Sequence, residues 1–171
     1  AADQMLDSKW ARQVGQRAQT LAQMKDKGGH IKIPGFYDDV RALSDEERNA
    51  WKTLPFNEKQ YKKGLGAPKL QGETGYTTLE RQWTRPTLEV NGMWGGYTGA
   101  GFKTVLPAEA SAKVSFRLVS RQDPAKVLTA FRAWAESRIP ADCRIEWHDG
   151  INGSPASVMS ITNPAFEKAR T

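Results

Sequence analysis

The sequence predicts a small α+β domain. Apolar residues recur at helical spacing over residues 9–27 and again over 124–138. Apolar and polar residues alternate, as in a strand, over 86–93, 109–120 and 142–149. Adding one strand before the first helix gives the order βαββαβ, the ferredoxin-like arrangement in which two helices back an antiparallel sheet. The 171 residues suit a single domain, and we expect its first strand to be missing from this chain.

Both helices have recognisable ends. Gly28 and Gly29 follow the first one, and glycine readily adopts the left-handed conformation found just after a helix. Asp123 before Pro124 is typical of a helix start, because an aspartate N-cap often precedes a proline in the first turn. The residues expected to face the core are Trp10, Val14, Ala18, Leu21, Val127, Leu128, Phe131 and Trp134.

The central strand has one apolar and one polar side. Ala110, Ala112, Val114, Phe116 and Leu118 alternate with Ser111, Lys113, Ser115 and Arg117. This period of two is typical of an antiparallel sheet with one buried face and one face in water.

Residues 30–85 read as an insertion of short helical turns inside the single domain 1–171. Ser44 with Glu47, and Thr77 with Glu80, have the spacing of capping boxes at helix starts. Asn57 is a further candidate N-cap. The segment shows no hydrophobic pattern that would build a second core.

Charge and composition argue against several classes of protein. Lys and Arg number 25 against 19 acids, and the segment from Arg48 to Arg85 carries eight basic and three acidic residues. Such a segment can bind nucleic acid, although a solvated surface is the commoner outcome. No apolar run has the length of a membrane span, no secretory signal is visible, and Cys143 has no cysteine to pair with. These features favour a cytoplasmic protein that binds neither membrane nor nucleic acid.

Familiar catalytic and cofactor motifs are missing. Gly92 to Thr104 is glycine-rich, but Phe102 separates Gly101 from Lys103, so the run fails the phosphate-loop pattern. It reads instead as a long turn, of the kind that often binds a ligand. The two histidines are far apart in the sequence, and no serine-nucleophile elbow occurs. We therefore expect no catalytic and no metal-binding residue in this chain.

Arg117 is the most informative polar residue of the central strand. It is expected on the water-facing side. It could pair with an acid on the neighbouring strand such as Glu89, or it could hold a carboxylate through two parallel hydrogen bonds. The residue pattern leaves both interpretations open.

The motif G-x-x-G-G-x-T-G-x-G-x-K-T-V-x-P, followed by F-R-L-V and Q-D-P, lies within residues 85–124. This stretch closely resembles the lid, or dimerisation, domain of the co-catalytic zinc exopeptidases. That superfamily includes carnosine dipeptidase, glutamate carboxypeptidase, acetylornithine deacetylase and succinyl-diaminopimelate desuccinylase, and the carnosine-dipeptidase-like branch is the most similar. IPGFYDDVRALSDEER upstream, and HDGINGSP and NPAFEKA downstream, extend the resemblance over about residues 30–168.

The resemblance implies a role for three residues. Arg117 and Thr104 would hold the carboxylate end of the substrate, with the threonine reaching across a homodimer, and His148 would lie near the substrate. The intact enzyme would use two zinc or other divalent ions to hydrolyse a dipeptide or N-acyl amino acid. All metal ligands and the catalytic glutamate would lie outside this chain, which would not be catalytic alone. The family's lid histidine, in an H-S-G motif, is absent here, as expected if the chain begins after the first strand.

Two other functions compete with this interpretation. One is a basic α+β module that binds nucleic acid through residues 48–85. The other is a dimerisation module with no ligand-binding role.

Overall fold

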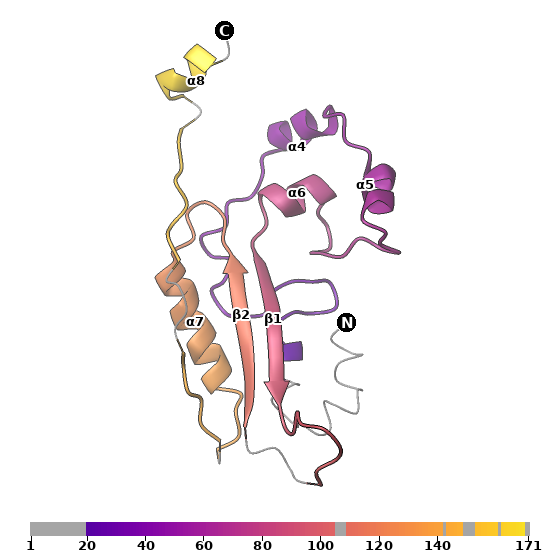
Figure 1. Cartoon of the computed structure of the whole chain (residues 1–171). Coiled ribbons are helices and arrows are strands. Elements are labelled where there is room, and N and C mark those ends of the chain that lie inside the picture. The colour runs from indigo at the N-terminus through magenta and orange to yellow at the C-terminus, as the bar shows by residue number, and fades with distance from the viewer. Residues whose placement is uncertain (1–19, 105–108, 142, 149–152, 161, 170–171) are drawn as a thin grey trace.

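The computed structural model describes residues 20–104, 109–141, 143–148, 153–160 and 162–169. Its elements are α4 (Asp45–Lys52), α5 (Glu58–Gly64), α6 (Thr78–Trp83), β1 (Thr87–Gly95), β2 (Ala110–Arg117), α7 (Pro124–Glu136) and α8 (Pro164–Ala169). Figure 1 shows α7 running alongside the β1–β2 pair, the three short helices of the insertion beyond one end of the strands, and α8 apart from both. The predicted α+β class is confirmed.

Strands β1 and β2 pair antiparallel, and their apolar residues share one face as predicted. Leu88 lies opposite Phe116 and Val90 opposite Val114, on the side of the core. The register shifts between Val90 and Gly92, where one extra residue on β1 forms a bulge. All four polar residues alternating along β2 are exposed, so the predicted water-facing side is confirmed.

The core lies between α7 and the two strands. Phe131 and Trp134 of α7 are buried, and the Phe131 ring lies 5.3 Å from that of Phe116. Residues at the start of the segment 30–85 complete the core, since Phe36 is only 1% exposed and its ring lies 5.9 Å from Phe116. The insertion thus leaves the core and returns to it, and it contributes no buried residue from α4 or α5.

The third strand, predicted over 142–149, does not form in the described residues 143–148. The alternation there is real, because Ile145 and Trp147 pack against the core while their neighbours are exposed. The Trp147 ring lies 5.7 Å from Phe131, and its Nε1 donates to Glu136 at 3.0 Å. Alternating apolar residues indicate that one side of a segment is buried, and here packing against the core buries that side without strand pairing.

The first helix ends earlier than predicted. Residues 20–22 are helical, and the rest of the predicted range up to residue 19 lies outside the described residues. Asp26 accepts hydrogen bonds from the backbone N–H groups of Gly28 and His30 at 2.8 and 2.9 Å. Aspartate competes with helical hydrogen bonding in this way. A tight turn results, with Gly29 at a φ of 81° and Lys25 bridged to Ile31.

The short helices of the insertion begin at the predicted caps. Ser44 and Thr77 each form a complete capping box, and Asn57 accepts a hydrogen bond from the Gln60 N–H. A partly buried ion pair joins two of the helices, because Arg48 of α4 lies 2.6 Å from Glu80 of α6. These contacts hold the insertion together without a second hydrophobic core.

Candidate functional site

Arg117 ends β2 with its side chain exposed on the water-facing side of the sheet. It lies opposite Thr87 in the register. Glu89, the acid that periodicity offered as a partner, instead forms an ion pair with Lys25 at 3.4 Å. The exposed guanidinium has the form needed to bind a planar carboxylate through two hydrogen bonds.

Thr104 lies at the opposite end of the hairpin from Arg117. β1 and β2 start their pairing at Thr87 with Arg117 and finish it at Gly95 with Ala110, and the glycine-rich loop follows that far end. The seven strand steps from Ala110 to Arg117 span roughly 23 Å at about 3.3 Å per residue. One chain therefore does not bring Arg117 and Thr104 to the same small ligand.

The glycine-rich loop is shaped by a tyrosine inside it. The Tyr97 hydroxyl donates a hydrogen bond to the Ala100 carbonyl at 2.9 Å. A Cβ atom on Gly99 would lie only 2.5 Å from that hydroxyl oxygen, so residue 99 has no room for a side chain while Tyr97 keeps this position. The Lys103 ammonium lies 5.8 Å from the centre of the Tyr97 ring. The loop forms a compact turn that leaves Thr104 exposed.

His148 is exposed at the end of the segment that follows α7. Its neighbour Trp147 is fixed against Phe131 and Glu136, so the chain is anchored one residue before the histidine. The residues just after His148 lie outside the described part of the chain. The three predicted site residues thus lie in three separate parts of the molecule.

A charged cluster that the sequence did not indicate lies beside the core. Arg85 Nε and Nη2 donate to the two carboxylate oxygens of Glu73 at 2.7 and 2.8 Å, and both side chains are 10% exposed. The guanidinium carbon lies 4.8 Å from the ring centre of Tyr37 and 4.3 Å from that of Tyr76. His30 Nδ1 lies 2.9 Å from Glu73 and its ring stacks on Tyr37. The members are up to 55 positions apart in sequence, so no spacing signal indicated the cluster.

Glu73 and Arg85 both keep their charges at ordinary pH. Burial alone would raise the pKa of Glu73, but hydrogen bonds from Arg85 and His30 outweigh burial and lower it. Burial likewise opposes the charged form of Arg85, yet the hydrogen bond and charge of Glu73 raise its pKa. Neither group changes charge near neutrality, so the pair fastens the insertion to the start of β1 and does not act as an acid or base.

The arginines of the basic segment 48–85 are used inside the domain. Arg48 binds Glu80, Arg85 binds Glu73, and Arg81 Nε donates to the Glu73 backbone carbonyl at 2.8 Å. The lysines of this segment remain exposed, namely Lys52, Lys59, Lys62, Lys63 and Lys69. The segment therefore presents less free charge than its composition indicates.

Metal ligands do not gather in the described part of the chain. No group of three or more His, Cys, Asp and Glu residues is placed there to hold a metal ion. Within those same residues, no helix is both long and apolar enough to cross a membrane.

Fold and site together define a small α+β module that offers a solvent-exposed arginine and a projecting loop, with no metal-ligand cluster in its described residues. A family model described as the peptidase dimerisation domain, from the M20 peptidases, matches residues 16–143. The chain belongs to this family.

The similar proteins are peptidases. The human Beta-Ala-His dipeptidase is 33% identical over 107 residues, which are 63% of this chain and 21% of that protein. A Cys-Gly metallodipeptidase of Candida albicans is 32% identical over 99 residues, covering 58% of this chain and 20% of its own length. The crystal structure of an M20 family metallo-carboxypeptidase from Sulfolobus solfataricus matches with a TM-score of 0.61 and 39% identity, covering 72% of this chain and 32% of that one.

The chain spans about a fifth of the length of these curated relatives. It is therefore similar to one domain of a larger kind of enzyme. The family membership agrees with the resemblance seen in the sequence, which also pointed to dipeptidases.

Proposed function

We propose that this chain is the dimerisation lid of a zinc-dependent metallopeptidase that hydrolyses dipeptides or N-acyl amino acids as a cytoplasmic homodimer. The observation that supports it best is the placement of Arg117 and Thr104 at opposite ends of one hairpin, both exposed. If both residues hold the same substrate, they must come from two different chains. A domain from a dimerisation family has the means to arrange this.

In this proposal the chain binds and orients the substrate. Arg117 donates two hydrogen bonds to the terminal carboxylate and neutralises its charge. Thr104 of the other subunit adds a hydrogen bond, and His148 contributes a polar group nearby. Fixing the carboxylate holds the scissile bond in position relative to the catalytic groups, which lowers the entropic part of the barrier.

In this proposal residues outside this chain hold the metal, as the family resemblance implies. Metal ions in such hydrolases polarise the carbonyl and activate water. The residues of this chain carry out none of that chemistry.

If the proposal is correct, the intact enzyme hydrolyses dipeptides with zinc, and this domain alone neither hydrolyses them nor binds zinc. The full-length protein should hydrolyse simple dipeptides, lose this activity with a chelator, and regain it when zinc is added back. The 171-residue chain should show no hydrolysis and no stoichiometric zinc after dialysis. Hydrolysis by the isolated chain, or a full-length protein inactive on dipeptides and N-acyl amino acids with zinc present, would contradict the proposal.

A further inference from the structure

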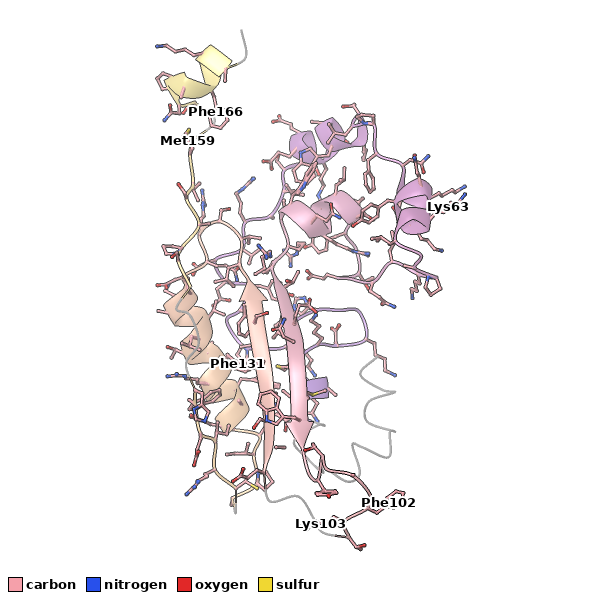
Figure 2. The ribbon with its side chains drawn as sticks, viewed as in Figure 1. Lys63, Phe102, Lys103, Phe131, Met159 and Phe166 are labelled. Carbon is pink, nitrogen blue, oxygen red and sulfur yellow. The ribbon has the colours of Figure 1, made fainter. Side chains whose placement is uncertain are left out.

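Phe102 is the most exposed large apolar residue among those that the structure describes. Its relative exposure is 105%, whereas Trp94 and Tyr97 in the same hairpin are about half exposed. Figure 2 shows Phe102 at the tip of the glycine-rich loop, directed away from the domain. A single exposed apolar side chain is common on a protein surface, so the position of this ring decides what it can contact.

The order of the loop explains why this ring faces outward. Tyr97 folds back onto Gly99 and Ala100, and Lys103 lies over the Tyr97 ring. Gly101, at a φ of 84°, adopts the left-handed conformation that lets the chain turn just before Phe102. The residues before and after Phe102 thus make contacts within the loop. Phe102 makes none of these contacts, and its ring forms the apolar surface at the tip of the loop.

Phe102 is also tied to the position of Thr104. Only Lys103 lies between them, so their Cα atoms are at most about 7 Å apart, because consecutive Cα atoms are 3.8 Å apart. A ring at that distance from a residue holding the substrate carboxylate is close enough to contact the side chain of the same substrate residue.

We propose that Phe102 enters the substrate pocket of the second subunit and forms an apolar wall for the side chain of the substrate's C-terminal residue. This inference rests on the proposed function, in which Thr104 crosses the dimer to the carboxylate. The occupant is a second copy of the enzyme, because the loop that carries Phe102 lies at the end of the hairpin remote from Arg117 of its own chain. The wall favours dipeptides that end in leucine or phenylalanine over those that end in glycine.

The test compares Ala-Leu with Ala-Gly as substrates of the intact enzyme. In Phe102→Ala the ratio of kcat/KM for Ala-Leu to that for Ala-Gly should fall about 10-fold or more, since one apolar contact typically discriminates by 10–200-fold. Phe102→Leu should retain part of the ratio. Phe166→Ala is the matched control, because Phe166 is also exposed, at 41%, but lies on α8 away from the loop, and it should keep the wild-type ratio.

A mixed dimer tests whether the wall acts across the interface. Phe102→Ala subunits are combined with an excess of Arg117→Ala subunits, so that nearly every Phe102→Ala subunit has an Arg117→Ala partner. The site of the Phe102→Ala subunit then has an intact Arg117 and receives Phe102 from its partner. The wild-type ratio of kcat/KM values should therefore return. A ratio that stays at the Phe102→Ala value would place the wall in the same subunit and overturn the inference.

Two further outcomes would also overturn it. An unchanged ratio in Phe102→Ala would show that the ring does not contact the substrate side chain. Equal losses on both substrates together with dissociation of the dimer would make Phe102 an interface anchor. In both cases the proposed function is still supported if the wild-type enzyme hydrolyses Ala-Gly. A wild-type enzyme that is inactive on both dipeptides and on N-acyl amino acids would instead contradict the proposed function.

Discussion

Replacing Arg117 with alanine in the intact enzyme is expected to lower kcat/KM for a dipeptide by roughly 30- to 5,000-fold. Truncating a residue that pairs with a buried carboxylate costs about 2–5 kcal/mol of binding or transition-state stabilisation. The guanidinium is exposed in the isolated domain and lies on the water-facing side of β2. Its loss should therefore remove substrate contacts and leave the core intact.

Thermal unfolding of the same variant shows whether Arg117 binds substrate or stabilises the fold. Surface substitutions usually change stability by no more than about 0.5 kcal/mol, so the melting temperature should stay close to the wild-type value. Lys113→Ala is a matched control, because it removes a positive charge from the same exposed side of β2. A large drop in melting temperature with normal kcat/KM in the folded fraction would make Arg117 a structural residue.

Glu73→Ala is expected to destabilise the domain by about 3–5 kcal/mol. The substitution leaves Arg85, only 10% exposed, without the carboxylate that binds it through two hydrogen bonds. Removing one partner of a buried pair is costly because the remaining charge stays in a poorly solvated place. Urea unfolding of the 171-residue chain measures the change.

Asp39→Ala is the control for that loss. Asp39 pairs with Lys126 at 3.4 Å on the surface, where the two side chains are 42% and 71% exposed. Exposed pairs contribute about 0–1 kcal/mol, so the control should remain near wild type. Equal stabilities of the Asp39 and Glu73 variants would show that the charged cluster does not fasten the insertion to β1.

The free energy of unfolding should depend on pH because of the ion pair between Glu73 and Arg85. The pKa of Glu73 is lowered from its ordinary value of 4.5, so the unfolded chain takes up this proton before the folded one. Its stabilising contribution is complete above that ordinary value and is lost as pH falls through the lowered pKa. Wild type should therefore lose more stability than Glu73→Ala below about pH 4.5. Parallel losses in both proteins would contradict the assignment.

Local signals predicted the helix starts correctly. Ser44, Asn57, Thr77 and Asp123 all accept the expected backbone hydrogen bonds, because a cap involves residues only two or three positions apart. The alternation in β2 likewise predicted which side is exposed. These features depend on neighbours in the sequence, which a single sequence records directly.

Features that depend on distant contacts could not be predicted in the same way. The alternation around Ile145 and Trp147 indicated burial, but a strand needs a paired backbone, and these residues pack against the core with Trp147 on α7. The contact between Glu73 and Arg85 needs the insertion to return to the start of β1. The sequence placed Arg117 on the exposed side, yet only the register of β1 and β2 revealed its separation from the loop.

The most direct test of a site shared between two chains uses a mixed dimer of Arg117→Ala and Thr104→Ala subunits, purified with two different affinity tags. Each variant alone should be strongly impaired, the threonine variant by about 10- to 150-fold if it loses a hydrogen bond to a charged group. In the mixed dimer one of the two sites has both residues intact, so activity should return to about half of the wild-type value per dimer. Activity that remains at the average of the two parent variants would show that Arg117 and Thr104 do not meet across the dimer.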